Sequence, residues 1–577
     1  MTSERPPASD SATVPSGPMT QPEAVAHLVR NDPTWATGTR TRDGVSYKAF
    51  LNAPAHVPDM MRQARAKQGD GAADYLVYGD ERLTYDDFLA RVDAMAQAMR
   101  SELGLGPGDR IAIAMRNYPE FLIAMLATAS IGAVSVFLNA WWTTEELDYA
   151  LRDSAASVVI ADGPRLARLA PLASPRLTLI GVRDSEADAP HRWSTLIAKG
   201  DPAQAADADI APDADFAIMY SSGTTGHPKG VVLTHLGVVT AVWSWLMQTA
   251  IAPLTAPPGP DSPPVLRSSV LITTPLFHVT ALFAQYMLTM PAGAKVTLMH
   301  KWDPQAAMDI IEAEQITRFL GVPTQSADLQ AAARAAGRSL PSLRYMGSGG
   351  AKRPAAQVAG LAETFPTAGV ATGWGMTETC ALGIGMAGPD YVARPNAAGR
   401  LYPPVQELRI VDEAGQPLPN GELGEITVKS LANMRGYLNQ PEATAEVLRD
   451  GWLHTGDLGI LDDEGFVTIL DRKKNIIIRG GENIACLDVE GAIHAHPDVI
   501  EACAFSIPHE RLGEVVGAAL QLRPGATLTE GELEAFLAPR IARFKIPEKI
   551  WCQHDPLIRG ATDKTDRRAI RAACLGL

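Results

Sequence analysis

The chain has 577 residues and a formal net charge of −14, from 51 Lys and Arg against 65 Asp and Glu. That length requires two or more domains rather than one compact core. An acidic chain lacks the basic face of a nucleic-acid-binding protein, so we expect no nucleic-acid partner. Any polyanionic ligand would have to be held by small local basic sites.

The five cysteines are scattered, and no two of them have the CxxC spacing of a zinc or redox site. The N-terminus has no basic segment followed by an apolar one, so the sequence predicts no signal peptide. Reduced thiols in a cytoplasmic protein are the expected state.

Three stretches lack any charge over about the length of a membrane span, but each is interrupted by Gly or Pro. They are Phe121–Trp142, Leu236–Ala256 and Ser268–Ala294. We expect core burial, as a helix followed by a buried parallel strand, and no membrane span. Peripheral contact with a lipid surface stays open.

Residues 1 to about 20 are rich in Ser, Pro, Thr and Asp and are expected to form a disordered tail. From there to about residue 210, amphipathic helices alternate with short apolar strands. Asp86–Arg100 and Glu145–Arg152 read as helices, and Arg110–Met115 and Ser157–Ala161 as strands. This alternation predicts α/β layers with a parallel sheet.

Residues 211–395 repeat this pattern, apart from Ala252–Pro264, whose six prolines predict a surface loop. From residue 400 the pattern changes to short strands with tight turns. Gln406–Val411 and Glu425–Ser430 are examples, with a turn at Asp412–Gly415. We expect an antiparallel, barrel-like part here.

After Asp471 the sequence predicts a small α+β domain. Asn475–Ile478, Val499–Phe505 and Val515–Leu522 read as strands, and Val489–His494 as a helix. Thr529–Glu532 is a capping box that opens a helix through Phe536. The expected division is therefore a tail (1–20), a large α/β domain with parallel sheets and a small β-barrel part (21–471), and a small mobile α+β domain (472–577).

The run YSSGTTGHPKG, Tyr220–Gly230, lies between the apolar segments Phe216–Tyr220 and Val231–Leu233. Small residues let backbone N–H groups turn toward one point, hydroxyls add donors and a lysine adds charge. Such a nest suits phosphate oxygens, although the spacing differs from that of a Walker A loop. The candidate phosphate-binding residues are Ser221, Ser222, Gly223, Thr224, Thr225, Gly226 and Lys229.

This segment resembles the phosphate loop of the adenylate-forming superfamily of acyl-CoA synthetases, adenylation domains and luciferases. Further motifs of that family follow in order, and the resemblance extends from about residue 25 to the end. They are Thr273–His278 (TTPLFH), Gly373–Glu378 (GWGMTE), Thr455–Asp457 (TGD), Asp471–Lys474 (DRKK) and Gly480–Asn483 (GGEN). The resemblance implies that ATP activates a carboxylic acid as an acyl-adenylate, with Mg²⁺, before transfer to coenzyme A.

The resemblance also assigns the nucleotide-binding residues. Glu378 would bind Mg²⁺, and Asp457 would accept the ribose hydroxyls with support from Arg472. Thr377 would bond the α-phosphate, and Trp374 would lie against adenine, where the family more often has Tyr. The remaining expected nucleotide contacts come from Gly349, Gly350, Gly373, Gly375 and Met376.

For catalysis the resemblance points to Lys564, Glu378, Thr225 and His278. Lys564 would stabilise charge at the α-phosphate, and His278 would lie where the carboxylate enters. Asp563 stands where the family usually has Gly, which places a negative charge beside that lysine. Lys474 is the expected hinge. Rotation there would bring the face of Gly480 and Gly481 to the pantetheine arm of coenzyme A, and Arg479 could meet its anionic end.

The acid itself is the least determined part of the sequence. The expected pocket residues are Trp245, Phe277, Val279 and Thr324, with Gly347, Ser348 and Gly349 leaving room. A medium or long fatty acid, or a bulky aryl or steroid-like acid, suits such a pocket. Two rivals stay open: transfer to an amine or carrier protein, and a catalytically weak homologue that binds nucleotide or acyl ligand. A homodimer also stays open.

Overall fold

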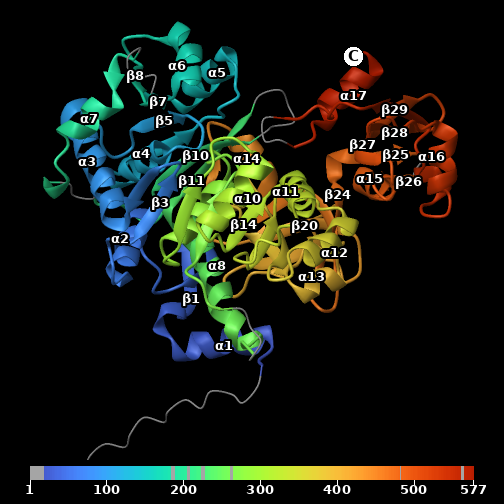
Figure 1. The fold of residues 1–577 in the computed structure, drawn as a ribbon, viewed down its shortest axis with the longest axis horizontal. Coiled ribbons are helices and arrows are strands. Elements are labelled where there is room, and N and C mark those ends of the chain that lie inside the picture. The colour runs from blue at the N-terminus through green and yellow to red at the C-terminus, as the bar shows by residue number, and fades with distance from the viewer. Residues whose placement is uncertain are drawn as a thin grey trace, which may run out of the picture.

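The computed structural model describes residues 18–183, 189–204, 208–221, 228–259, 264–480, 482–560 and 564–577. Figure 1 shows a large part, built around two sheets, and a small C-terminal part that projects from one side of it. We call the small part, Ile476–Leu577, the small domain. The fold is α/β with mixed sheets, as the sequence predicts.

The first large sheet has eight strands in the order β21-β11-β10-β6-β5-β7-β8-β9. Its strands from β10 to β9 run parallel, and β10 and β11 form an antiparallel pair that brackets the predicted phosphate loop. The bounds are β5 Arg110–Ala114, β6 Val134–Phe137, β7 Val158–Ala161, β8 Thr178–Gly181, β9 His191–Arg192, β10 Asp215–Ser221, β11 Lys229–Thr234 and β21 Gly436–Tyr437.

The second large sheet has nine strands in the order β18-β17-β16-β15-β14-β12-β13-β3-β4. Its strands from β16 to β3 are parallel. At one edge β4 pairs antiparallel with β3, and at the other β17 pairs antiparallel with both β16 and β18. The bounds are β3 Asp74–Tyr78, β4 Glu81–Thr84, β12 Ser269–Ile272, β13 Lys295–Leu298, β14 Arg318–Gly321, β15 Tyr345–Ser348, β16 Gly369–Gly375, β17 Gly383–Ala387 and β18 Arg400–Leu401.

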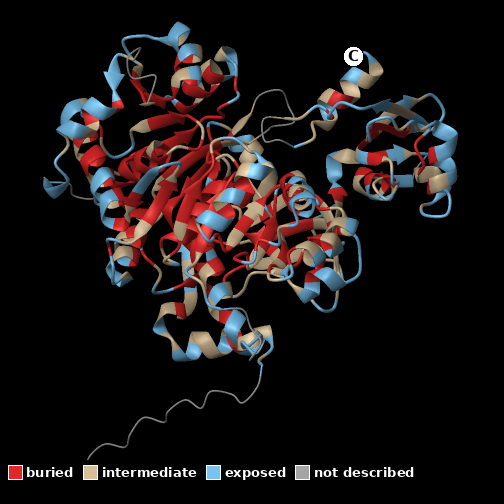
Figure 2. Ribbon diagram, in the orientation of Figure 1, coloured by how far each residue is buried: buried red, intermediate tan, exposed pale blue. Residues whose placement is uncertain are grey.

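The helices of the large part cover these sheets and lie between them. Figure 2 shows the buried residues concentrated in the sheets and in the helices between them. The bounds are α1 Gln21–Asn31, α2 Val57–Lys67, α3 Tyr85–Leu103, α4 Pro119–Ser130, α5 Thr144–Ser154, α6 Gly163–Leu169, α7 Trp193–Lys199, α8 His235–Thr255, α9 Val279–Ala281, α10 Pro304–Ala313, α11 Pro323–Ala336, α12 Ala355–Thr364, α13 Pro389–Ala393 and α14 Pro441–Val447.

The largest hydrophobic cluster joins residues of both sheets to α3, α4 and α8. Each large apolar side chain buried there stabilises the fold by roughly 1.5–3 kcal/mol. Helix α8 is long and apolar enough to cross a membrane, but 67% of its apolar window is buried inside the protein. Its composition therefore fits a core helix.

Only the first uncharged stretch follows the expected order of helix and then strand, as α4 and β6. Leu236–Ala256 is almost entirely the single helix α8, and Ser268–Ala294 begins with β12 and turns helical afterwards. Those two expectations are wrong because a continuous apolar run carries no periodicity that separates a buried helix from a buried strand.

The remaining strands form a two-stranded pair, an antiparallel sheet and the sheet of the small domain. The first two comprise β1 Thr37–Arg42, β2 Val45–Phe50, β19 Glu407–Val411, β20 Gly424–Lys429, β22 Leu448–Arg449, β23 Trp452–Leu461 and β24 Val467–Arg472. The small domain comprises β25 Ile476–Arg479, β26 Glu482–Ala485, β27 Val499–His509, β28 Gly513–Leu522, β29 Lys549–Gln553, α15 Cys486–Ile493, α16 Glu530–Leu537 and α17 Arg567–Leu575.

Most elements that the sequence predicts are present with their ends shifted by a few residues. The capping box at Thr529 is confirmed, since its hydroxyl accepts from the backbone of Glu532. The loop predicted for Ala252–Pro264 begins too early, because α8 continues through Pro253 to Thr255. A proline in the last turn removes only one backbone donor. Of the predicted tail, residues 1–17 lie outside the described residues, and Thr20 caps α1.

A buried asparagine fixes the segment that carries the TTPLFH motif. The Asn117 side chain donates to the carbonyls of Thr274 (2.9 Å) and Met299 (3.3 Å), and it accepts from the backbone N–H of Leu276 (2.9 Å). Asn117 is 4% exposed. It replaces the ladder partners that this segment loses after β12, and so holds His278 in place.

We expect Asn117→Ala to destabilise the large part, because it leaves the buried Leu276 N–H without a partner. An orphaned buried group costs about 1–3 kcal/mol. Urea denaturation followed by tryptophan fluorescence would measure the loss. The control is Asn420→Ala, which removes an exposed 3.2 Å bond to Asp463. Equal stabilities for the two variants would contradict the role given to Asn117.

Candidate active site

The hairpin of β10 and β11 presents the candidate phosphate loop. Ser221 pairs with Lys229 across the hairpin, and Ser222, Gly223, Thr224, Thr225 and Gly226 lie outside the described residues. The Lys229 ammonium lies 4.8 Å from the ring centroid of Tyr437 on the neighbouring strand β21. This contact directs the lysine toward the segment that carries Glu378.

Glu378 is a buried carboxylate, 7% exposed, at the turn between β16 and β17. The Tyr437 hydroxyl donates to Oε1 of Glu378 at 3.0 Å. The backbone carbonyl of Glu378 accepts from the N–H of Met434 at 2.8 Å. Burial is the main cause that raises the pKa of Tyr437, so this phenol stays a hydrogen-bond donor. No motif in the sequence predicts a role for Tyr437, which lies 59 residues further along the chain than Glu378.

The described residues include no group of three or more His, Cys, Asp or Glu placed to hold a metal ion. Mg²⁺ commonly keeps its waters and binds substrate phosphates through one or two protein carboxylates. A single buried carboxylate such as Glu378 therefore fits the expected ion.

The GWGMTE motif forms the end of β16 and a tight return into β17. A Cβ on Gly375 would lie 2.1 Å from the carbonyl oxygen of Ala381, and one on Gly383 would lie 2.3 Å from that of Trp374. Neither position accepts a side chain. This close packing turns Trp374 toward the antiparallel sheet.

Asp457 on β23 receives two hydrogen bonds from neighbouring strands. The Trp374 indole Nε1 donates to Oδ2 at 2.7 Å, and the Arg472 Nε donates to Oδ1 at 3.0 Å. Asp457 is 3% exposed. Burial raises the pKa of this carboxyl, and the charge of Arg472 and the two hydrogen bonds counteract the increase. The sequence predicts all three residues at the nucleotide, and the structure brings them together.

Lys564 of the small domain extends to Gly350 of the large part. Gly350 has φ +80°, and a Cβ there would lie 2.9 Å from the lysine Cε and 3.4 Å from its Nζ. Gly350 is therefore needed both for its left-handed backbone and for the space that the lysine occupies. Gly349 and Gly373 lie close to each other, since a Cβ on Gly349 would lie 3.9 Å from the carbonyl oxygen of Gly373.

Lys564 as a whole residue is exposed to solvent, whereas its ammonium group lies among protein atoms. That desolvation, followed by repulsion from Arg472, lowers the pKa of Lys564 to about 8, and Asp457 counteracts it. Asp563, the departure from the family pattern, lies outside the described residues.

His278 lies near Lys564 and is neutral. Burial, with the charge of Lys564 adding to it, lowers the pKa of His278 to about 3. Its Nε2 is buried and has no hydrogen-bond partner among the described residues. A buried ring nitrogen without a partner is costly unless a ligand meets it.

The expected acyl-pocket residues are mostly core residues. Trp245, Phe277 and Val279 belong to the large hydrophobic cluster, while the hydroxyl of Thr324 is buried without a partner in the described structure. The Phe277 ring lies 4.5 Å from that of His278 and 5.4 Å from Trp141, a pocket neighbour that the sequence did not suggest.

The expectation that Gly347 leaves room for the acid is wrong. A Cβ at this position would lie 2.4 Å from the Tyr345 ring, so the tyrosine already fills that space. The Ser348 hydroxyl is buried without a described partner, and Gly349 has only Thr280 Cγ2 at 3.5 Å and the carbonyl oxygen of Gly373 within 4 Å. Of the three residues that were expected to leave room for the acid, Gly349 is the one with open space beside its Cα.

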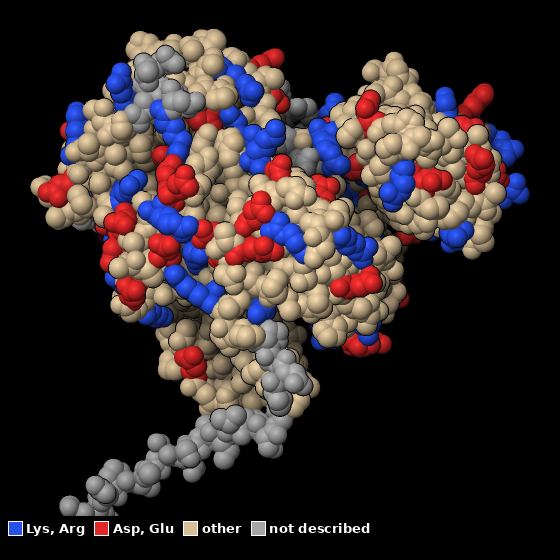
Figure 3. Space-filling model, in the orientation of Figure 1, with Lys and Arg blue, Asp and Glu red and all other residues tan. Residues whose placement is uncertain are grey.

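The small domain directs Lys564, and not the GGEN face, toward this site. Arg479 pairs with Glu548 at 2.8 Å, and a Cβ on Gly480 would meet Leu512, so the contacts described for both lie within the small domain. Gly481 lies outside the described residues. Lys474 lies in a single turn between β24 and β25. Figure 3 shows Lys and Arg side chains along the junction between the two parts.

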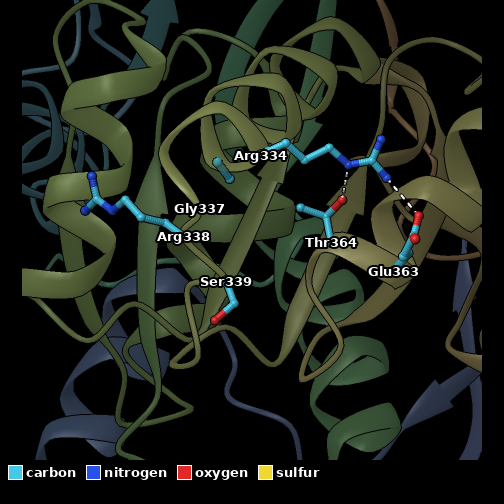
Figure 4. A pocket seen from close by; sticks show the side chains of 7 residues that line it. Arg334, Gly337, Arg338, Ser339, Glu363 and Thr364 are labelled. Atoms are coloured by element: carbon cyan, nitrogen blue, oxygen red, sulfur yellow. Dashed lines mark hydrogen bonds and ion pairs between the residues drawn. The ribbon is translucent and has the colours of Figure 1, made fainter.

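A surface cavity of about 430 Å³ lies away from this site, between the ends of α11 and α12. Figure 4 shows Arg334 there, donating to Thr364 (2.9 Å) and to Glu363 (3.0 Å). Its charge is already satisfied, and the cavity shares none of the residues discussed above. This cavity is therefore separate from the candidate site around Asp457, His278 and Lys564.

Comparison with known proteins agrees with this geometry. Residues 61–438 match the family described as AMP-binding enzyme, and residues 488–560 match the AMP-binding enzyme C-terminal domain. The chain therefore belongs to the adenylate-forming family of AMP-binding enzymes. Within that family it is an acyl-CoA synthetase, an AMP-forming ligase of acids and coenzyme A.

Individual relatives differ in the acid that their names give. A feruloyl-CoA synthase from Amycolatopsis is 36% identical over 478 residues, which cover 82% of this chain and 90% of that one. A long-chain-fatty-acid–CoA ligase from Mycobacterium tuberculosis is 31% identical over 479 residues, which cover 82% of this chain and 89% of that one. The crystal structure of ATP-bound MatB from Rhodopseudomonas palustris has a TM-score of 0.79 at 27% sequence identity. The match covers 89% of this chain and 98% of that one.

We expect Trp374→Phe to raise the KM for ATP by about tenfold with little change in the KM for the acid. A hydrogen bond to a charged group contributes about 1.5–3 kcal/mol, and 1.4 kcal/mol is a factor of ten. Steady-state kinetics would measure both constants. The matched control is Trp302→Phe, which removes an indole bond of 2.9 Å to Asp328 outside the site. Equal ATP constants for the two variants would contradict this role.

Proposed function

We propose that this ligase activates a carboxylic acid with a large apolar body, either a bulky aryl or steroid-like acid or a medium- or long-chain fatty acid. One observation carries the site assignment: the Lys564 side chain lies against Gly350, near enough to His278 and Asp457 for their charges to act on one another. The buried Nε2 of His278 has no hydrogen-bond partner among the described residues. The apolar residues behind His278, and relatives named for a feruloyl and a long-chain fatty acyl substrate, support the substrate class.

In the first half-reaction, an oxygen of the acid attacks the α-phosphorus of ATP. The bond from that phosphorus to the bridging oxygen breaks, and pyrophosphate leaves with the electron pair. Positioning and neutralisation of charge supply most of such catalysis. Asp457 would accept the ribose hydroxyls, Lys229 would meet phosphate oxygens, and Lys564 would stabilise the charge at the α-phosphate. Glu378 would hold Mg²⁺, which neutralises phosphate charge.

His278 suits the entry of the acid because it carries no charge of its own. A neutral imidazole beside Lys564 avoids a second cation, and its open nitrogen can form a hydrogen bond to a carboxylate oxygen or to water. In the second half-reaction, the thiol sulfur of coenzyme A attacks the acyl carbon, AMP leaves and the thiol proton goes to solvent. Rotation about Lys474 would first withdraw Lys564.

We expect AMP and thioester from one class of acid in a panel of ferulic, decanoic, palmitic and cholic acids, assayed with and without coenzyme A. Lys564→Ala should abolish AMP formation while ATP still binds. AMP without thioester would move the second step to an amine or a carrier protein. ATP binding without AMP from any acid would contradict the proposal and support a nucleotide-binding homologue.

The pH dependence of adenylation should follow the charge of Lys564. With its pKa lowered to about 8 in the free enzyme, the ammonium is present below that pH and is lost above it. The kcat/KM for ATP should therefore be level below about pH 8 and fall about tenfold per pH unit above it. Lys564→Arg keeps its charge and should lack this fall, although its plateau is lower. A fall at the same pH in both proteins would assign the titration to another group.

A further inference from the structure

Lys564 stands at the end of a short hairpin of the small domain. The Gly560 N–H donates to the Lys564 carbonyl at 2.8 Å, and the Asp566 N–H donates to the Ile558 carbonyl at 2.9 Å. Between these bonds, Arg559 and Thr565 face each other as an isolated antiparallel bridge. We call the Arg559–Thr565 pair the hairpin stem. The residues that hold this stem therefore determine the position of the Lys564 backbone, from which the side chain extends.

One carboxylate holds both sides of the stem. Glu501, on β27, accepts from the Arg559 Nη2 at its Oε2 (2.9 Å) and from the Thr565 hydroxyl at its Oε1 (2.8 Å). The Glu501 side chain is 13% exposed and that of Arg559 is 24% exposed. Each oxygen of one carboxylate therefore binds one side of the hairpin, in surroundings where solvent screens the ion pair only partly.

The strand that carries Glu501 is itself firmly fixed. Strand β27 pairs along its length with β28, and Cys503 and Phe505 of β27 pack against Leu557 and Ile570 in a small hydrophobic cluster. The segment after the stem has its own anchor, because Arg567 binds the buried Glu490 at 2.6 Å. Glu490 fixes the start of α17, whereas Glu501 joins the two sides of the hairpin to each other.

Lysine is the side chain for which such an anchor matters most. It is a point charge on a flexible chain of four carbons, and Lys564 crosses from the small domain to Gly350. A misplacement of about 1 Å in an aligned reacting group can cost about 100-fold in rate. The residues that hold a catalytic side chain then contribute to the rate without touching the substrate.

We infer that Glu501 is a positioning residue for adenylation, which aims Lys564 by binding Arg559 and Thr565 together. This inference rests on the proposed role of Lys564 in the first half-reaction. It implies a division between the two steps: loss of the anchor slows formation of the acyl-adenylate and spares transfer of the acyl group to coenzyme A. A residue that only stabilises the small domain would affect both steps.

The test is Glu501→Gln in the full-length protein, because glutamine keeps the size of the side chain but offers only one acceptor oxygen. The first half-reaction is measured as acid-dependent exchange of labelled pyrophosphate into ATP, with the panel acid that forms most AMP. The second is measured as thioester formation from the purified acyl-adenylate of that acid. We expect the first rate to fall by about 10- to 100-fold and the second to stay within about twofold.

Two further variants separate the anchor from general stability. Thr565→Val removes only the bond to Oε1 and should slow adenylation to a smaller extent. In the double variant, the effects should be less than additive, since both act on one anchor. Asp488→Asn is the matched control, because it breaks a 2.8 Å ion pair with Lys545 in the same domain, away from the hairpin. It should leave the ratio of the two rates unchanged.

The outcomes distinguish this inference from the proposed function. If Lys564→Ala does not slow pyrophosphate exchange, the role of Lys564 fails and the inference falls with it. If Lys564→Ala slows exchange but Glu501→Gln and Thr565→Val do not, the inference alone is wrong. A parallel loss of both half-reactions in Glu501→Gln, with a lower melting temperature, would show a structural role and also overturn it. Slower adenylation with intact thioester formation supports it.

Discussion

The buried carboxylate of Asp457 is the constraint around which the site is arranged. At 3% exposure a carboxylate is stable as an anion only if hydrogen bonds and a cation compensate for lost hydration. Trp374 and Arg472 provide that compensation from two different strands, β16 and β24. The Trp374 bond joins the second large sheet to the antiparallel sheet, and the Arg472 bond lies within the antiparallel sheet, between the paired strands β23 and β24. Arg472 is also the last residue of β24, so the same ion pair fixes the point where the chain leaves for the small domain.

The same pair also acts on the charge of Lys564. Desolvation is the main cause that lowers the pKa of the lysine; repulsion from Arg472 lowers it further, and attraction to Asp457 counteracts both. His278 adds no charge because its own pKa is lowered to about 3. In the free enzyme this balance leaves the ammonium poorly solvated and only partly compensated. The phosphates of ATP would supply the negative charge that the Lys564 ammonium lacks. A local positive charge of this kind would let a chain with a net charge of −14 bind a polyanion.

The sequence was sufficient for the motifs and for most elements, and it failed where the result depends on contacts between distant segments. The resemblance to the adenylate-forming family assigned Trp374, Asp457 and Arg472 to one nucleotide, because each lies in a motif that the family shares. Tyr437 beside Glu378 and Glu501 beside Thr565 have no such signal, since each pair is joined only by the folded sheets. The error at Gly347 has a local cause: Tyr345 lies two residues away on the same face of β15, where its ring covers the glycine. The phosphate loop itself, Ser222–Gly226, remains a prediction.

The anchors of the site divide between the two parts of the chain in a way that suits two successive reactions. Glu501 and Glu490, which hold the Lys564 hairpin and the start of α17, belong to the small domain. The partners of Glu378 and the Trp374 donor belong to the large part. In the proposed rotation, Lys564 would leave the site together with the supports that hold it, and the supports of the nucleotide would stay behind.

Asp471 lies in the chain between the large part and the small domain and is 1% exposed. Its carboxylate accepts from the Asn475 side chain and from the backbone N–H of Leu487 in the small domain. A buried carboxylate with several donors keeps the junction ordered, and in the proposed rotation the short turn after it, which contains Lys474, would absorb the change in backbone angles.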